Sequence, residues 1–393
     1  MFREAIAQMA PYTPGEQPRP GQRLIKLNTN ENPYPPSPRV KAAIVKAASP
    51  SLRLYPHPRA DELVKAAARF YGISREMILA GNGSDELLAM LFRAALARGD
   101  KVAYALPTYS LYDTLAAIQE AQVAAVPLGP GFAQPLAALA AERAALTIVC
   151  NPNSPCGSLA SPVQLDNLAR GLDGRLLAID EAYVDFAEYH ALPLVKSYPN
   201  VVVLRSFSKS FSLAGMRVGL CFAQPPVIEQ LLKVKDSYNL SRLAISAGVA
   251  ALADVSWMRR NVERIKRVRV VTEERLRQMG FEVPPSQANF VLARIQGHDM
   301  TAVAAGLRRR GILVRHFPQS VFHDSLRISI GTPAQMDALF KALESLMRPV
   351  LAVRANGAAG KGERSHRARP LRHAAATPGP QSGQASRRLM PGQ

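Results

Sequence analysis

Cysteine is scarce in this chain of 393 residues: there are three, Cys150, Cys156 and Cys221, and none forms a C-x-x-C pair. Three cysteines are too few for a disulfide framework, and their spacing does not match a zinc or redox motif. The chain also lacks an apolar run long enough to cross a bilayer. Its N-terminus lacks the apolar core of a signal peptide. We therefore expect a reduced, cytoplasmic protein with no metal site and no membrane contact.

Acidic residues are also in short supply, with 30 against 49 Lys and Arg, which gives a net charge of +19. Residues 349–393 hold eight basic residues against Glu363 alone, so seven of these net charges lie there. That segment consists mainly of Ala, Gly, Pro, Ser, Gln and Arg, and it has no aromatic residue to stack on a base. We expect residues 350–393 to be a disordered, passive tail and not a nucleic-acid-binding arm.

The remaining composition is that of a globular protein, with 48% hydrophobic and 20% charged residues, and the length suits two domains. Between Met77 and Gly219, strand-like and helix-like segments alternate, which predicts an α/β fold with a mostly parallel sheet. After Ser241 a long basic helix and short strands indicate a smaller α+β region. The predicted boundaries are 1–40 for an N-terminal arm, 41–245 for the large domain and 246–349 for the small C-terminal domain.

Apolar runs give the expected elements. The strands are predicted at 77–80, 101–105, 146–150, 176–179, 201–204, 281–283, 290–293, 312–315 and 326–330. The main helices are predicted up to Arg98, over 111–121, 257–279 and 302–310, and up to Met347. Polar clusters follow several of these strands, and ligands of open α/β sheets bind beyond the carboxyl ends of strands. We therefore look for chemistry in those clusters.

The strongest local pattern lies in Ser206-Phe-Ser-Lys-Ser-Phe-Ser-Leu-Ala-Gly-Met-Arg-Val-Gly219. Lys209 directly follows an apolar strand and is flanked by hydroxyl residues, so its amine is expected to be buried and reactive. Arg217 lies eight residues further on and can direct a guanidinium at a phosphate. A solvated surface lysine does not explain this neighbourhood.

A second cluster begins with Asp180 at the end of an apolar strand. A buried carboxylate is costly unless it meets a cation, and the protonated nitrogen of a pyridine ring is such a cation. Tyr183 lies close enough in sequence to reach a phenolic oxygen on the same ring. The alternative is an aspartate that only caps the next segment.

Two further clusters are less specific. Gly81-Asn82-Gly83-Ser84-Asp85 opens a helix, where free N–H groups and a serine hydroxyl favour a phosphate. A glycine-rich turn before a capped helix would look the same. Asn151-Pro-Asn-Ser-Pro-Cys-Gly157 forms a rigid turn that suits the presentation of one polar side chain, although a bare turn needs no function.

In this order the clusters resemble the fold-type-I aminotransferases, whose cofactor is pyridoxal 5'-phosphate (PLP). The resemblance runs from about Leu24 to Leu346. More narrowly, the chain is similar to histidinol-phosphate aminotransferases. That narrower similarity rests on Leu27-Asn-Thr-Asn-Glu-Asn-Pro33, Arg53-Leu-Tyr-Pro56 and Leu326-Arg-Ile-Ser-Ile-Gly-Thr332.

The resemblance implies a role for each matching residue. Lys209 forms the Schiff base and moves the proton, Asp180 pairs with the ring nitrogen, Tyr183 contacts the ring oxygen and Tyr109 stacks on the ring. The remaining implied cofactor contacts are Gly83, Ser84, Asp85, Asn153, Ser206, Ser208 and Arg217, with Tyr55 reaching the phosphate from the partner of a homodimer. Arg327 grips the substrate carboxylate or phosphate, and Arg315 and Asn32 also bind substrate.

One position departs from the family pattern. An asparagine usually precedes the second proline of the turn, and here that residue is Ser154. Asn153 is therefore expected to take over the contact with the ring oxygen, with Ser154 as the alternative. Cys156 likewise stands where threonine is common.

The resemblance implies a transamination between L-glutamate and imidazole-acetol phosphate that yields L-histidinol phosphate and 2-oxoglutarate, a step of histidine biosynthesis. Threonine-phosphate decarboxylases and aromatic-amino-acid aminotransferases share much of this pattern and stay as alternatives. From a different class, the chain could be a basic nucleic-acid-binding protein on an inactive PLP fold. The intact set of Lys209, Asp180 and Arg217 argues against that alternative.

Overall fold

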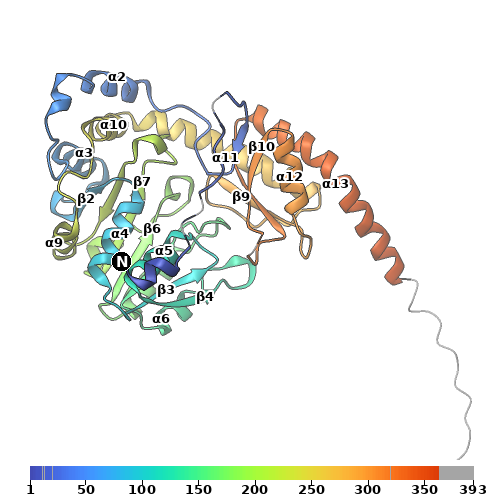
Figure 1. Cartoon of the computed structure of the whole chain (residues 1–393), viewed down its shortest axis with the longest axis horizontal. Helices are drawn as coiled ribbons and strands as arrows, with labels where there is room; N and C mark the ends of the chain where they lie inside the picture. The colour runs from blue at the N-terminus through green and yellow to red at the C-terminus, as the bar shows by residue number, and fades with distance from the viewer. Residues whose placement is uncertain (11, 13, 20, 319, 363–393) are drawn as a thin grey trace, which may run out of the picture. The chain divides into compact units, whose positions relative to one another are not determined.

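The computed structural model describes residues 1–362 except 11, 13, 20 and 319, and residues 1–347 form one compact unit built around two sheets (Figure 1). The larger sheet contains β2 (Ile78–Gly81), β3 (Lys101–Leu106), β4 (Gln122–Pro127), β5 (Leu146–Cys150), β6 (Leu176–Asp180), β7 (Val201–Ser206) and β8 (Gly219–Phe222). The smaller sheet contains β1 (Ile25–Leu27), β9 (Phe290–Arg294), β10 (Ile312–His316) and β11 (Ser325–Ser329).

The helices of the described residues are α1 (Glu4–Gln8), α2 (Pro38–Ala47), α3 (Asp61–Tyr71), α4 (Ser84–Ala95), α5 (Leu111–Gln119), α6 (Leu136–Ala141), α7 (Pro162–Gly171), α8 (Leu194–Ser197), α9 (Pro225–Val234), α10 (Arg242–Ala253), α11 (Val255–Gln278), α12 (Thr301–Arg309) and α13 (Pro333–Gly362). The long helix α11 contacts α10 at one end of its course and β9 of the smaller sheet further along (Figure 1). It therefore connects the two sheet regions.

The larger sheet has the strand order β2-β8-β7-β6-β5-β3-β4. Strands β7, β6, β5, β3 and β4 pair in parallel, whereas β8 is antiparallel to both β2 and β7. Every residue of β5 and β7 is buried, which explains why these strands are continuous apolar runs. The predicted α/β fold with a mostly parallel sheet is confirmed, and the carboxyl ends of β5, β6 and β7 meet at one edge.

Helices cover this sheet with their apolar faces. A buried cluster around Phe92, Tyr104, Tyr112 and Leu204 packs α4 and α5 against the strands. Helix α7 begins with a capping box in which Ser161 and Gln164 satisfy each other's backbone N–H groups. The packing of these helices fixes the strand ends, because a close-packed core leaves them little freedom.

The smaller sheet shows how far the N-terminal arm reaches. Strand β1 lies within residues 1–40 and pairs in parallel with β10, with Ile25 opposite Ile312. The remaining order is β10-β11-β9, with antiparallel pairs. The expected strand at 281–283 is reduced to one isolated bridge between Glu282 and Arg294. The predicted arm therefore contributes an edge strand, residues 25–27, to the small sheet.

The end of α13 corrects one expectation. A disordered tail was predicted from residue 350, but α13 continues to Gly362. Residues 350–362 include four alanines, and alanine has the highest helix propensity, which offsets the glycines in the same stretch. The rest of the predicted tail, 363–393, lies outside the described residues.

The structure also bears on the cysteines and on the capacity of the helices to span a membrane. All three cysteines are buried and unpaired by disulfides. Every helix in the described part of the chain is too short or too polar to span a membrane.

Candidate active site

A cavity of about 720 Å³ lies at the carboxyl edge of the larger sheet. It collects side chains from the larger sheet, the N-terminal arm and the smaller sheet. The predicted site residues that line it are Ser84, Asp85, Tyr109, Asp180, Tyr183, Ser206, Ser208, Lys209, Arg217, Arg315 and Arg327. Four predicted residues do not line it: Gly83, Asn32, Asn153 and Tyr55.

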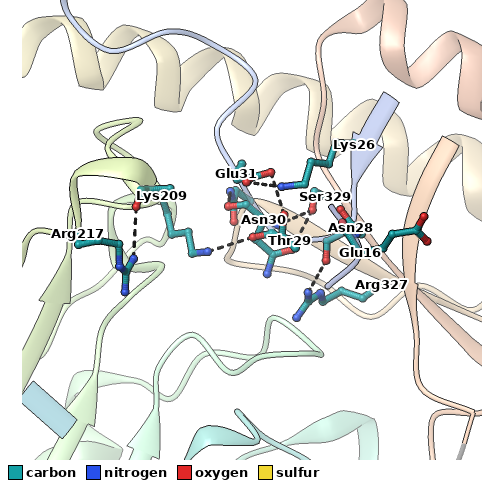
Figure 2. Close-up of polar contacts among 12 residues, drawn as sticks. Glu16, Lys26, Asn28, Thr29, Asn30, Glu31, Lys209, Arg217, Arg327 and Ser329 are labelled. Carbon is teal, nitrogen blue, oxygen red and sulfur yellow. Dashed lines mark hydrogen bonds and ion pairs between the residues drawn. The ribbon is translucent and has the colours of Figure 1, made fainter. Parts of the chain in front are cut away.

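Lys209 lies in the turn after β7 and directs its amine into the cavity (Figure 2). The Nζ atom donates a hydrogen bond to the backbone oxygen of Thr29 at 3.1 Å. Burial lowers the pKa of the Lys209 amine to about 8, and the positive charge of Arg327 acts in the same direction. At pH 7 about a tenth of the amine is therefore neutral, far more than for an ordinary lysine, and a lysine nucleophile requires this neutral form.

Asp180 ends β6 and is buried, with a relative exposure of 2%. Its partners among the described residues are neutral: the Tyr112 hydroxyl donates at 2.7 Å and the Ala182 backbone N–H at 3.1 Å. Burial raises the pKa of the Asp180 carboxyl to about 6, against the opposing effect of these hydrogen bonds. Only neutral donors from the described part of the chain contact this buried carboxylate. A cationic ring nitrogen placed beside it would stabilise its charge.

The opposite end of the cavity suits a phosphate. Helix α4 begins at Ser84, and its free N–H groups and positive dipole end favour an anion. Arg217 donates to Ser208 Oγ at 3.2 Å and forms an ion pair with Asp85 at 2.9 Å. A Cβ atom at Gly83, where φ is 85°, would lie 2.5 Å from the Arg217 guanidinium. Glycine is thus required there for the guanidinium to approach the helix start.

The Tyr109 ring lines the cavity and lies beside the fully buried ring of Tyr112. The Tyr109 ring packs edge-on against Tyr112 with centroids 5.7 Å apart, and its hydroxyl donates to Asp85 at 3.1 Å. Burial raises the pKa of the Tyr109 hydroxyl, so the residue stays neutral. A neutral aromatic ring on the wall of the cavity is suited to covering the face of a planar ligand.

The turn at 151–157 corrects the expectation for Asn153. Its side chain is fully buried within the turn, where Oδ1 accepts from Cys156 Sγ at 3.4 Å and Nδ2 lies 3.5 Å from Thr108 Oγ1. Ser154 lines the cavity in its place, and its hydroxyl accepts from Arg327 Nη1 at 3.1 Å. Ser154, the alternative named for Asn153, is therefore the polar residue of this turn that lines the cavity.

The smaller sheet contributes two guanidinium groups, Arg315 from β10 and Arg327 from β11. Arg327 donates from Nη2 to the backbone oxygen of Asn28 at 2.9 Å, and its Nε is buried without a hydrogen-bond partner among the described residues. Burial lowers the pKa of Arg327, and the charge of Arg315 adds to this effect. Two adjacent cations, one with an unsatisfied donor, form a site for an anionic group.

Asn32 and Tyr55 lie outside the cavity of this chain, and Tyr55 was predicted to serve the site of a partner subunit. Asn32 Nδ2 donates to the backbone oxygens of Lys209 at 3.0 Å and Ser210 at 3.1 Å. These two hydrogen bonds stabilise the backbone of the turn that contains Lys209. Tyr55 is 78% exposed and stacks on Tyr238 with a centroid distance of 4.4 Å. In this single chain neither side chain enters the cavity.

Sequence reasoning missed several residues of the cavity. Tyr12, Thr29, Asn30 and Glu31 line it, all from the N-terminal arm. The arm motif 27–33 was noticed as a family signature, but nothing in its composition shows which side chains face a site 150 or more residues away. Tyr112 was also missed; it does not line the cavity, but its hydroxyl donates to Asp180.

The comparisons with known proteins agree with this geometry. The family model "Aminotransferase class I and II" matches residues 22–343. The chain belongs to the class I and II aminotransferase family. The fold-type-I resemblance drawn from its motifs is thus confirmed.

The relatives within this family are similar over their whole length. The histidinol-phosphate aminotransferase of Citrifermentans bemidjiense is 46% identical over 345 residues, covering 88% of this chain and 98% of the relative. Histidinol-phosphate aminotransferase 1 of Trichormus variabilis is 41% identical, covering 88% and 99%. The crystal structure of the Sinorhizobium meliloti histidinol-phosphate aminotransferase in complex with pyridoxal-5'-phosphate has a TM-score of 0.82 and 29% identity, covering 89% of this chain and 98% of that one.

Proposed function

We propose that this protein catalyses the PLP-dependent transfer of an amino group from L-glutamate to imidazole-acetol phosphate, yielding L-histidinol phosphate and 2-oxoglutarate in histidine biosynthesis. One observation carries the proposal: the amine of Lys209, whose pKa is lowered by burial, shares a cavity with the buried carboxylate of Asp180. Full-length similarity to histidinol-phosphate aminotransferases supports the choice of reaction.

The residues present fit PLP at each of its functional groups. When bound, the cofactor supplies a ring that accepts the electrons released at the substrate carbon. Lys209 would hold it covalently, and Asp180 would keep the ring nitrogen protonated. The residues that would hold the phosphate are Ser84, Ser206, Ser208 and Arg217, with Asp85 orienting Arg217. Tyr109 would cover one face of the ring and Tyr183 would donate to its oxygen.

Lys209 has a second task once the cofactor is bound to substrate. Its free amine, whose pKa is about 8 in the cofactor-free protein, would take up and return a proton near neutral pH. Thr29 supplies a backbone oxygen 3.1 Å from Nζ, which keeps the free amine oriented within the cavity. The same group thus holds the cofactor and moves the proton.

Arg315 and Arg327 account for the use of two different substrates. Glutamate presents a carboxylate and imidazole-acetol phosphate presents a phosphate, and a guanidinium pair accepts either anion. The unsatisfied Nε of Arg327 and the Ser154 hydroxyl beside it give this end further hydrogen-bonding capacity. One anion site therefore serves both halves of the reaction.

The proposal includes a cytoplasmic homodimer, as the resemblance implies. Tyr55 is exposed and outside the cavity of its own chain, which is the placement expected of a residue that serves the partner's phosphate site. The division into a PLP-binding domain at 41–245 and a small domain at 246–349 belongs to the same proposal.

A direct assay tests the reaction. Purified protein loaded with PLP is incubated with glutamate and imidazole-acetol phosphate, and 2-oxoglutarate is measured; parallel reactions contain threonine phosphate, with carbon dioxide measured, or an aromatic 2-oxo acid. We expect the first reaction to be the fastest by kcat/KM. Carbon dioxide release from threonine phosphate without 2-oxoglutarate formation would replace the proposal with a decarboxylase.

A further inference from the structure

Asn30 connects the two sheets at the active site through hydrogen bonds that have a defined direction. It is buried, with a relative exposure of 1%, and its φ is 56°, a left-handed conformation that asparagine tolerates better than most residues. Figure 2 shows it between Lys209 on one side and Ser329 on the other. None of the roles assigned so far uses this side chain.

The orientation of the Asn30 amide is fixed by Ser329. The Ser329 hydroxyl oxygen accepts from the Asn30 backbone N–H at 2.9 Å, and its own proton is donated to Asn30 Oδ1 at 3.0 Å. The amide oxygen is thereby occupied, so the amide nitrogen must point the other way. Ser329 is itself buried, with 2% exposure, so water does not compete for these bonds.

The amide nitrogen then decides which way the Tyr183 hydroxyl acts. Asn30 Nδ2 donates to the Tyr183 hydroxyl oxygen at 3.0 Å. Nδ2 has only protons to offer, so Tyr183 accepts from it and keeps its own proton for another acceptor. Tyr183 lines the cavity, and the second hydrogen bond to its hydroxyl, from Ser154, is also donated to it and leaves the Tyr183 proton for another acceptor.

We propose that Ser329 and Asn30 form a positioning relay that fixes the Tyr183 hydroxyl as a hydrogen-bond donor into the active-site cavity. The inference rests on the proposed function, in which Tyr183 donates to the ring oxygen of PLP. Asn30 and Ser329 do not touch the cofactor in this scheme and act through Tyr183. The relay spans the arm, the turn after β6 and strand β11.

The charges around Tyr183 are compatible with this role. Burial raises the pKa of its hydroxyl, while Arg327 and the hydrogen bonds from Asn30 and Ser154 act in the opposite direction. Lys209 Nζ lies 5.8 Å from the ring centre, and Cys150 and Tyr109 are further titratable neighbours. The donors around Tyr183 therefore strengthen its hydroxyl as a hydrogen-bond donor.

The position of Ser329 gives the relay a link to substrate binding. Arg327 precedes Ser329 by two residues on β11, so both side chains lie on the same face of the strand. A shift of β11 that repositions the substrate-binding guanidinium also repositions the hydroxyl that orients Asn30. Arg327 and the hydroxyl that orients Asn30 are thus carried by the same strand face.

The test measures the pH dependence of the absorbance of lysine-bound PLP. A donor to the ring oxygen favours the anionic form of that oxygen, so losing the donor raises the apparent pKa. Asn30→Gly keeps the positive φ and removes the amide, and we expect the pKa to rise by about one unit, a tenfold change in the ionisation constant. Asn30→Asp should raise it further, because a carboxylate accepts the Tyr183 proton itself.

A double-mutant cycle separates the relay from general loosening. In a Tyr183→Phe background, Asn30→Gly should cause no additional shift. Asn289→Ala removes the bond from Asn289 Nδ2 to the Asn30 backbone oxygen at 2.9 Å without touching the amide. This control should lower the melting temperature and leave the absorbance pKa unchanged. Equal shifts with and without Tyr183, or an equal shift in the control, would overturn the relay.

Ser329 provides a second route if the Asn30 variants do not fold. Ser329→Ala should shift the pKa in the same direction by a smaller amount, and Ser329→Thr, which keeps the hydroxyl, should restore the wild-type value. A wild-type value in Ser329→Ala contradicts the relay. If wild-type protein shows no absorbance that depends on Lys209, the proposed function fails first, and the two failures are thus distinguishable.

Discussion

The two sides of the active-site cavity are built in different ways. On the larger sheet, Asp180, Ser206 and Lys209 follow the ends of adjacent parallel strands, so local chain geometry places them together. On the smaller sheet, Arg327 is held by the backbone oxygen of Asn28, 299 residues away in sequence. The first side is expected to hold and tune the cofactor, and the second to recognise substrate. Substitutions on the two sides should therefore have separable effects.

The largest effect is expected on the cofactor side, for Lys209→Ala. The protein should fold but lose covalent PLP and at least about 10³-fold in kcat/KM, because one group supplies both attachment and proton transfer. Absorbance and turnover measure the two losses. Lys233→Ala, which removes an exposed lysine of α9, is the matched control and should match wild type. Retained lysine-type absorbance in Lys209→Ala would place the attachment elsewhere.

Asp180→Asn should be next, with about a 10²-fold loss of kcat. Folding raises the Asp180 pKa from 3.8 to about 6. Its contribution to stability is therefore fully present below pH 3.8 and lost as pH rises through 6. At pH 7 the cofactor-free Asn variant should thus be more stable than wild type by about 1–3 kcal/mol.

Asp166 offers a control for this stability gain. Like Asp180 it accepts a tyrosine hydroxyl, from Tyr198 at 2.8 Å, but it does not line the cavity. Asp166→Asn should give neither the gain at pH 7 nor the loss of kcat. Melting curves of cofactor-free protein from pH 4 to 7 supply the measurement, and a parallel pH trend in wild type and Asp180→Asn would contradict the assigned burial cost.

On the substrate side, Arg327→Ala should lower kcat/KM for both substrates by about 10- to 100-fold, since hydrogen bonds to charged groups contribute about 1.5–3 kcal/mol. PLP absorbance should persist, which distinguishes this side from the cofactor side. Arg309→Ala, at an exposed position of α12, is the control. If Arg327→Ala loses cofactor and keeps normal KM values, the assignment of the two sides is wrong.

A milder test of the cofactor side uses pH alone. Only the neutral amine of Lys209 captures PLP, and its pKa is lowered to about 8. The capture rate of cofactor-free protein should therefore rise with pH through about 8 and level off above it, with about a fivefold difference between pH 7 and 8. Stopped-flow absorbance measures the rate. A rise that continues to the ordinary lysine pKa of 10.5 would show that the amine is not desolvated.

The smallest effect is expected from truncation after Gly362. Residues 363–393 carry six basic residues against Glu363. Their removal should leave kcat and KM unchanged and abolish any retention on a nucleic-acid column. Loss of turnover in the truncated protein would contradict a passive tail.

The fold of the larger sheet was largely predictable because its central strands are buried on both faces. Strands β5, β6 and β7 appear as continuous apolar runs, and polar residues mark their ends. The edge strand β4 was missed because most of its residues are exposed or half-buried, so it has neither an apolar run nor a clean alternation. Strand β1 was missed because it has three residues and gains its partner only from β10.

The same distinction applies to the site. Lys209, Asp180 and Arg217 were predictable because each lies in a local motif whose chemistry is visible in sequence. The choice between Asn153 and Ser154 and the role of Asn30 were not. Which of two adjacent turn residues faces a ligand depends on the hydrogen bonds inside the turn, and the role of Asn30 depends on Ser329, 299 residues away. Long-range pairing of this kind leaves no periodic signal in a single sequence.

The pairing of β1 with β10 also determines when the catalytic centre can first exist during synthesis. Residues 25–27 leave the ribosome early, but their partners at 312–314 are translated almost 300 residues later. At a translation rate of about 5–20 residues per second, residues 25–27 stay without their strand partner for on the order of 15–60 seconds. The nascent larger sheet can form its parallel core within that interval, whereas the carbonyl groups that hold Lys209 and Arg327 assemble only near the end of translation.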